Sequence, residues 1–218
     1  MRIHLKLSSN KEKVPYNYQS VLTGKFHKWL GTNDFHDRIS LYSFSWLRKA
    51  KGAKHGLNFP SGSTWFISSH DDDVIKKIID GVRQDSHLAW GMLVQDIIIQ
   101  ETPSFGEEAL FNVGSPVFIK RWKNDRAEFI YYYHDASESC LTDTLKHKLR
   151  EAKMSEEGVS VEFDKNYKNP KTKVITFKDV KNKGSVCPVI VRGSSEQISF
   201  AWNVGVGNLT GIGFGSLI

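Results

Sequence analysis

The order of strand-like and helix-like segments in the first hundred residues constrains the fold more than any other feature. Four segments either alternate in polarity or are rich in β-branched and aromatic residues, as strands are: residues 2–8, 39–47, 63–69 and 89–102. Two others repeat apolar residues at helical spacing: residues 14–30 and 71–85. The predicted order is strand, helix, strand, strand, helix, strand, which is the plan of ferredoxin-like and RNA-recognition modules.

The ends of the two predicted helices carry their own markers. Pro15 and Asn17 can open the first helix, and Gly31 can end it. The second helix follows "HDDD" (residues 70–73), whose acids suit the positive end of a helix dipole. A metal cluster is the alternative for these four side chains, but we interpret them as a capped helix start.

The second half of the chain repeats the mixture of strands and a helix. Strands are predicted at residues 116–122, 128–134, 159–163, 173–180, 186–193 and 197–204, and a helix at residues 139–153. Periodicity fades between residues 102 and 115, where we place a domain junction. We therefore predict an α+β protein of two tandem ferredoxin-like (RRM-like) domains, residues 1–106 and 107–218, with a C-terminal glycine-rich loop.

Charge and composition limit the possible partners. Thirty Lys and Arg against 24 Asp and Glu give a formal charge of +6, which favours an anionic partner. Cys140 and Cys187 lack the spacing of a zinc site, and we expect them to be reduced thiols. We also expect no metal and no cofactor. The N-terminal residues have no apolar region typical of a signal peptide, and no apolar run is long enough for a membrane span. We expect a cytoplasmic protein.

The chain finishes in "NVGVGNLTGIGFGSLI", and no charged residue follows Glu196. Glycines let a backbone pass close to another backbone, and successive N–H groups can bind phosphate oxygens without any charge. The alternative is an ordinary turned C-terminus. No Lys-Ser/Thr pair and no helix follow the glycines, so neither a Walker loop nor a dinucleotide fingerprint is expected.

This tail resembles the C-terminal glycine-rich motif of the Cas6 family, the CRISPR-associated endoribonucleases that cut precursor CRISPR RNA, within the RAMP superfamily. The matching residues are Gly205, Gly207, Gly213, Phe214 and Gly215. The segments "MRIHLKL", "VPYNYQSVLTGKFHKWL", "LYSFSWL" and "GSPVFIK" are also similar to that family. The resemblance implies two ferredoxin-like domains and contact between CRISPR repeat RNA and the tail, whose glycines are Gly205, Gly207, Gly211, Gly213 and Gly215.

Two histidines are candidate acid–base residues. RNA can be cut by its own 2′-OH if a base removes that proton and an acid protonates the leaving oxygen, and histidine suits both roles. By position, His36 matches the family's loop histidine, and His27 matches a helix position held by tyrosine or histidine. Arg38 lies where some members have a lysine that steadies the phosphate. On the residues alone, His27 could instead be a partly buried filler and His36 an ordinary loop residue.

Basic segments are the candidate RNA contacts. The loop "RKAKGAKHG" contains Arg48, Lys49, Lys51 and Lys54, which suit phosphate contact, although a solvated loop is the alternative. Lys25 and Lys28 flank the proposed centre on the first helix. We interpret "YYYH" (residues 131–134) as a strand with a structural role, although its rings could stack RNA bases. We interpret Lys146, His147, Lys148 and Arg150 as a solvated helix face, with RNA contact as the alternative.

The function that this resemblance implies is a metal-independent endoribonuclease that binds CRISPR repeat RNA and leaves 2′,3′-cyclic phosphate and 5′-OH ends. Its product would pass to a CRISPR interference complex in antiviral defence, and a homodimer is possible. The alternative is a catalytically inactive RNA-binding RAMP subunit of a CRISPR complex. A nucleotide-dependent enzyme is disfavoured, because the glycines lack the residues such a loop needs.

Overall fold

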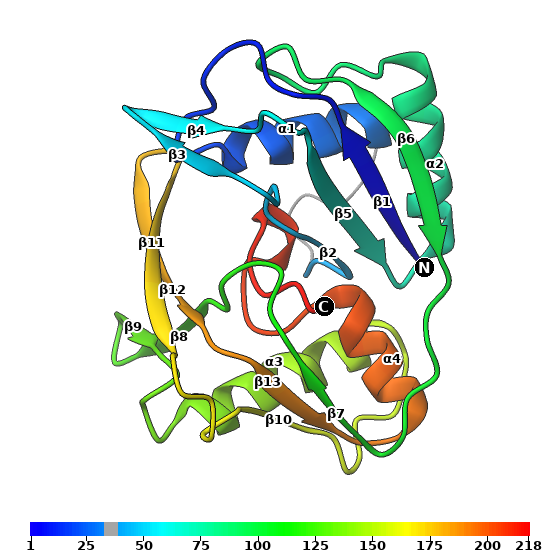
Figure 1. The fold of residues 1–218 in the computed structure, drawn as a ribbon. Coiled ribbons are helices and arrows are strands. Elements are labelled where there is room, and N and C mark those ends of the chain that lie inside the picture. The colour runs from blue at the N-terminus through cyan, green and yellow to red at the C-terminus, as the bar shows by residue number, and fades with distance from the viewer. Residues whose placement is uncertain (33–38) are drawn as a thin grey trace.

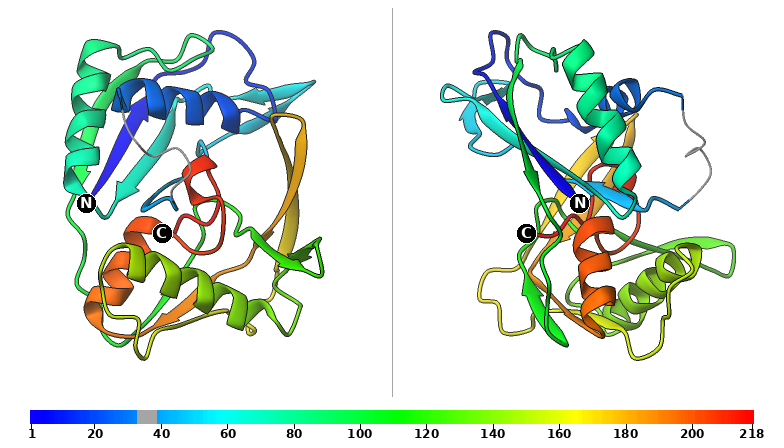
Figure 2. Two further views of the ribbon diagram at one scale, coloured as in Figure 1. Left: turned by 180° about the vertical axis from the view of Figure 1, so that it is seen from behind. Right: turned by 90° about the vertical axis from the view of Figure 1, so that its right-hand side faces the viewer.

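The computed structural model describes residues 1–32 and 39–218. The chain forms an upper and a lower half in the view of Figure 1, and each half has an antiparallel sheet with two helices on one side (Figures 1 and 2). The predicted α+β class is confirmed, and so is the predicted order of elements in the first half.

The first half contains a four-stranded sheet in the order β2-β5-β1-β6. Its strands are β1 (Arg2–Leu7), β2 (Tyr42–Phe44), β5 (Ser63–Ser69) and β6 (Val94–Gln100). Alternate residues of β1, namely Ile3, Leu5 and Leu7, are buried on one face. Helices α1 (Gln19–Leu30) and α2 (Asp72–Gln84) cover that face, as the view from behind in Figure 2 shows. The amphipathic alternation that predicted the strand therefore also fixes which face receives the helices.

Helix α1 begins later than predicted and ends where predicted. Asn17 does not cap it, because the Asn17 Oδ1 atom accepts a hydrogen bond from the backbone N–H of Thr176, 3.2 Å away in the second half. The helix begins at Gln19 instead. Gly31 ends it with φ +72°, and its N–H donates to the carbonyl of His27 at 3.1 Å. Glycine reaches this φ without steric cost.

The second half contains a three-stranded sheet in the order β10-β13-β7. Its strands are β7 (Glu108–Phe111), β10 (Ser160–Phe163) and β13 (Val189–Arg192), and its helices are α3 (Ser137–Glu151) and α4 (Ser195–Val204). Strand β7 lies in the segment where we placed the domain junction and predicted no strand. Residues 197–204, which we predicted to be a strand, belong to α4.

Helix α4 is stabilised by caps at its N-terminus and at its C-terminus. The Ser194 hydroxyl accepts from the N–H of Gln197, and the Gln197 side chain accepts from the N–H of Ser194, which is a complete capping box. Gly205 follows the last helical residue with φ +71°. Most residues of α4 are buried, so the helix lacks the polar face by which a surface helix is recognised.

Three two-stranded hairpins extend from these sheets. They are β3 (Lys51–Ala53) with β4 (Gly56–Asn58), β8 (Ile119–Lys123) with β9 (Arg126–Ile130), and β11 (Lys171–Phe177) with β12 (Val180–Val186). In the first, most of the segment that we predicted to be a basic loop forms a hairpin. The third runs along one side of the molecule from the lower half to the upper half (Figure 1). Strand β9 ends at Ile130, so the predicted strand over "YYYH" is wrong, and these residues form a turn in which the N–H of His134 donates to the carbonyl of Tyr131.

Apolar side chains gather in two large clusters, one for each half. The first includes Trp65 and Phe26, and the second includes Leu145 and Val189. A smaller cluster of Phe118, Ile175 and Phe214 lies where the C-terminal tail meets the second half. Most of the last fourteen residues are therefore buried, and the tail is not a loose end.

Candidate nucleic-acid interface

The glycine-rich tail runs back from α4 into the middle of the molecule, where the C-terminus lies between the two halves (Figure 1). The N–H of Val206 donates to the carbonyl of Gly215 at 2.9 Å, and the N–H of Gly215 donates to the carbonyl of Pro116 at 2.8 Å. A short 3₁₀ helix, η1 (Thr210–Ile212), lies between these two points and packs against α1 and β2. The tail thus closes on itself and joins both halves.

Close backbone packing explains why the tail needs glycine. Gly205, at φ +71°, would place a Cβ atom 2.5 Å from the carbonyl oxygen of Gly215. Gly207, at φ +75°, would place one 2.6 Å from the carbonyl oxygen of Phe118. A Cβ on Gly211 would overlap the Ser40 hydroxyl. The bare backbone is therefore required by the protein's own chain.

The tail amides differ from the predicted row of free donors. The N–H of Gly205 donates to the carbonyl of Ala201 at 2.8 Å, and the N–H of Gly213 donates to the carbonyl of Thr210 at 3.3 Å. Gly215 is engaged with Pro116 in the same way. These three amides serve the fold, so the mechanism predicted for them, phosphate binding by free N–H groups, is wrong. The more exposed residues of the tail are Asn208 and Leu209.

A buried lysine of α3 donates hydrogen bonds to the end of α4 and to the tail. Lys148 of α3 is 1% exposed, and its Nζ atom donates to the carbonyls of Val204 (3.0 Å) and Gly205 (3.2 Å) and to the hydroxyl of Thr210 (3.0 Å). Burial lowers the pKa of Lys148 to about 7, whereas three oxygen acceptors and the negative end of α4 favour its charged form. Our interpretation of Lys148 as part of a solvated face is wrong.

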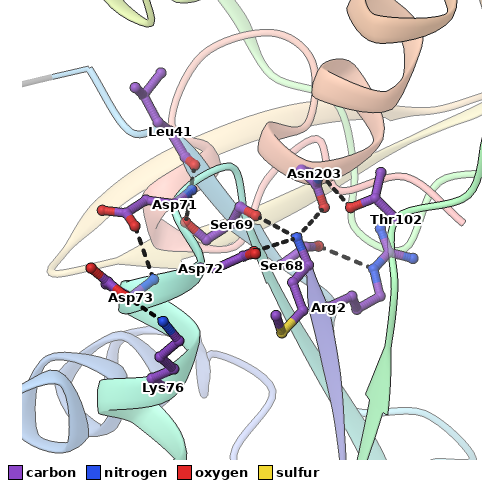
Figure 3. Close-up of polar contacts among 11 residues, drawn as sticks. Arg2, Leu41, Ser68, Ser69, Asp71, Asp72, Asp73, Lys76, Thr102 and Asn203 are labelled. Atoms are coloured by element: carbon purple, nitrogen blue, oxygen red, sulfur yellow. Dashed lines mark hydrogen bonds and ion pairs between the residues drawn. The ribbon is translucent and has the colours of Figure 1, made fainter.

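A second buried cation, Arg2, approaches the same end of α4. Its guanidinium donates to the carbonyls of Trp202 (2.9 Å) and Leu217 (2.8 Å) and to the Ser68 hydroxyl (3.1 Å), the last of which Figure 3 shows. It lies over the rings of Phe66 and Trp202. Burial lowers the pKa of Arg2 to about 9. Two cations thus fix the end of α4 and the tail that follows it.

The tail lies close to the predicted catalytic region. His27 is half-buried on α1, and its ring meets that of Phe26 edge-on with centroids 5.3 Å apart. Phe26 stacks on Tyr42 at 4.5 Å, and a Cβ on Gly211 would lie 3.0 Å from the Tyr42 hydroxyl. One chain of contacts therefore links the end of α1 to η1.

His36 and Arg38 lie outside the described residues, so their predicted roles beside His27 stay predictions. The segment that contains them starts beyond Thr32 and ends before Ile39. The following residue, Ser40, contacts the tail, because its carbonyl accepts from the Thr210 hydroxyl at 3.5 Å.

The two lysines predicted to flank the centre share one carboxylate. The Nζ atoms of Lys25 and Lys28 each lie 2.8 Å from Oδ2 of Asp85. Hydrogen bonds from Lys25, from Lys28 and from the N–H of His87 hold the pKa of the Asp85 carboxyl well below its usual range. Lys25 is only 9% exposed and lies over the ring of Trp29, so it contributes to the fold, and its predicted contact with RNA stays a prediction. Lys28 is exposed and stays a candidate.

Hairpin β3–β4 carries two of the four predicted basic side chains, Lys51 and Lys54, and Arg48 and Lys49 lie just before it; all four are exposed. The tip of hairpin β11–β12 lies beside it in both Figure 1 and Figure 2. That second hairpin carries four more exposed lysines, which we did not predict as RNA contacts: Lys171, Lys173, Lys178 and Lys181. Alternating lysines in an otherwise strand-like segment could have revealed them. Exposed basic side chains of both halves thus lie on two hairpins whose ends are neighbours.

The "HDDD" segment starts α2, as predicted. Asp71 is the N-cap and accepts from the N–H of Asp73 at 2.9 Å, and Asp73 pairs with Lys76 at 2.8 Å (Figure 3). Across the part of the chain that the structure describes, no three His, Cys, Asp or Glu side chains are grouped to hold a metal. None of the described helices is long and apolar enough to cross a membrane.

Comparisons with known proteins match this chain to CRISPR-associated proteins. The family model described as "CRISPR associated protein Cas6, C-terminal" matches residues 99–217. A curated protein of Pyrococcus horikoshii, a CRISPR-associated endoribonuclease-like protein Cas6nc, is 27% identical over 163 residues, which are 69% of this chain. The match spans 65% of that relative's length.

Solved structures share the fold over the whole chain. One, described as the characterization of a Cas6-related gene from Pyrococcus furiosus, has a TM-score of 0.87 at 21% identity and covers 100% of this chain and 97% of its own. Another, described as a RAMP protein binding different RNA substrates, has a TM-score of 0.85 at 21% identity, and the match covers 100% of this chain and 99% of that structure. At these identities the likeness shows a common fold.

Proposed function

Because the chain belongs to the Cas6 family of CRISPR-associated proteins, we propose that it is an endoribonuclease that binds CRISPR repeat RNA and cuts precursor CRISPR RNA within the repeats. Two relatives support this: one is named endoribonuclease-like, and the other is described as binding different RNA substrates. The exposed basic side chains of hairpins β3–β4 and β11–β12 suit phosphate contact.

The observation that carries the proposal is the position of the tail. Element η1 packs against α1, which carries His27, and the tail also contacts Ser40, just beyond the segment that carries His36 and Arg38. An RNA strand laid along the exposed part of the tail would therefore pass near the end of α1. This arrangement supports a reaction centre at that place.

The proposed chemistry uses the RNA's own nucleophile. One of His27 and His36 takes the proton of a 2′-OH, the oxygen attacks the adjacent phosphorus, and the other histidine protonates the leaving 5′-oxygen. Arg38 stabilises the charge on the phosphate. The products are a 2′,3′-cyclic phosphate and a 5′-OH, and no metal is needed. The glycines of the tail act by letting the backbone fold tightly under the RNA, and the product RNA stays bound for transfer to an interference complex.

We also propose that residues 1–106 and 107–218 are two ferredoxin-like domains in tandem. The order β2-β5-β1-β6 with two helices on one face is the arrangement of that plan, and β10-β13-β7 repeats three of its four positions. The fourth position is taken by the end of the tail, where Leu217 bridges to Val113 beside β7. Separate apolar clusters in the two halves support the division.

The test compares cleavage of a repeat RNA by the wild type, His27→Ala, His36→Ala and the control His147→Ala, whose imidazole is exposed on α3. Both active-centre substitutions should slow cleavage about 100-fold, the lower end of what a positioned acid or base contributes. The control should cut at the wild-type rate. A substrate with a 2′-deoxy nucleotide at the scissile position should bind but resist cleavage. Tight binding of repeat RNA without any cutting would instead identify an inactive RNA-binding RAMP subunit.

A further inference from the structure

The side chain of Trp122 on strand β8 is unusually exposed. At 69% exposure it is the most exposed of the large apolar side chains in the described part of the chain. A tryptophan offers a wide flat ring that is normally at least partly covered, because covering it is favourable. An indole left open on a rigid strand suggests a surface that another ring covers.

The register of the hairpin explains why the indole is open. Trp122 lies opposite Ala127, whose methyl group is too small to shield it, and Lys120 lies opposite Phe129. Because side chains alternate along a strand, Lys120, Trp122 and Phe129 share one face. The Nζ atom of Lys120 lies 4.6 Å from the centroid of the Trp122 ring. We call this face the Trp122 platform: Lys120, Trp122 and Phe129.

The opposite face of this hairpin is bound to helix α3. Arg121 points to the opposite face, where its guanidinium donates to the carbonyl of Cys140 and, at 3.0 Å, to the hydroxyl of Thr144 on α3. The hairpin is therefore anchored to a helix of the second half and needs little ordering when a ligand binds.

The platform is also continuous with the tail. The N–H of Lys120 donates to the Oδ1 atom of Asn208 at 2.8 Å. The ring of Phe129 contacts that of Phe118 with centroids 5.9 Å apart, and Phe118 contacts Phe214 at 5.4 Å. A strand that leaves the exposed part of the tail would meet this face next.

We propose that the Trp122 platform stacks an unpaired base of the bound RNA. This inference rests on the proposed function, since it needs an RNA strand on the tail. Charge favours RNA over an apolar protein partner, because the hairpin carries four cations and two acids: Lys120, Arg121, Lys123, Arg126, Asp125 and Glu128. Aromatic rings interleaved with cations are the usual means by which proteins bind single-stranded nucleic acid.

The test measures the Kd of wild type, Trp122→Ala and Trp122→Phe for a repeat RNA made non-cleavable by a 2′-deoxy nucleotide. Trp122→Ala should raise the Kd about 5- to 150-fold, the range of a lost base–aromatic stack. Trp122→Phe should keep most of the affinity, because a ring remains. The control Leu110→Ala removes a comparably exposed apolar side chain, 61% exposed on β7, and should leave the Kd unchanged.

A second measurement identifies the base and separates stacking from a general effect on the hairpin. Abasic nucleotides are placed one at a time along the RNA, and one position should weaken binding to the wild type but cause no further loss with Trp122→Ala. The slope of log Kd against log salt should match that of the wild type, since no charge is removed. If the wild type binds the RNA and Trp122→Ala binds it equally well, the platform proposal is overturned while the proposed function stands. If the wild type does not bind repeat RNA, the proposed function itself fails.

Discussion

Substituting Gly205 with alanine tests whether the tail is a packed joint between the halves. Gly205 has φ +71°, and an added Cβ would lie 2.5 Å from the carbonyl oxygen of Gly215 and 3.1 Å from the Cβ atom of Ser43. Both neighbours are backbone atoms or directly attached to the backbone, so they cannot move aside as a flexible side chain could. The backbone itself has to shift.

The loss has two parts. Placing a Cβ at positive φ costs about 1–2 kcal/mol, and overpacking of a tight site costs about 1–3 kcal/mol more. The free energy of unfolding should therefore fall by about 2–5 kcal/mol, which for a chain of this size lowers the Tm by roughly 4–20 °C. That is a large share of the stability of an ordinary domain.

The assay is urea and thermal unfolding of Gly205→Ala beside two controls. Gly158→Ala has φ +74° but no described atom within 4 Å of the added Cβ, so it measures the strain alone. Gly24→Ala, inside α1 and equally open, should stabilise the protein by about 0.5–1 kcal/mol. If Gly205→Ala loses no more stability than Gly158→Ala, the tail is not packed as described.

Two further predictions concern charge. The free energy of unfolding of Lys148→Met should differ from that of the wild type by an amount that depends on pH. The pKa of Lys148 is about 7 in the folded state and about 10.5 in the unfolded state, so the unfolded state binds more protons between these two values. The free energy of unfolding of the wild type should therefore rise relative to that of the variant by up to about 1.4 kcal/mol per pH unit. Urea titrations at pH 7, 8 and 9 measure this, and a constant difference would contradict it. Asp85→Asn should lower the Tm at pH 7 because Lys25 and Lys28 lose their partner. Since the pKa of Asp85 is lowered, that difference should shrink as the pH falls below about 4, whereas a difference that persists in acid would exclude the ion pair as its cause.

Local patterns predicted the fold well where they were not ambiguous. The start of α2 could be read from Asp71 to Asp73, because a capping carboxylate and first-turn acids act within one turn of chain. Helix α4 was misread because Ile198, Phe200, Trp202 and Val204 alternate as a strand would. The helix is buried on nearly every side, so periodicity could not distinguish the two, whereas its capping box could.

The buried cations mark the limit of prediction from sequence. Lys148 falls at heptad spacing from Leu141 and one position before Leu149, so its place on the buried face of α3 could have been foreseen. Its partners could not, because the carbonyls of Val204 and Gly205 lie more than fifty residues away. The carboxylate that binds Lys25 is equally remote in sequence.

The tail shows the same limit in another form. Its glycines correctly predicted a close approach of bare backbone, but the nearest partner is the protein's own chain, as at Gly207 and Phe118. A sequence pattern indicates that a Cβ would not fit, and only the three-dimensional arrangement shows what occupies that space.

The most direct test of the proposed reaction is end-group analysis of repeat RNA cut under single-turnover conditions in EDTA. Attack by the RNA's own 2′-OH predicts one cut per repeat, with a 2′,3′-cyclic phosphate on one fragment and a 5′-OH on the other. Fragments with 5′-phosphate and 3′-OH ends, or cutting that begins only when a divalent metal is added, would contradict acid–base catalysis by His27 and His36.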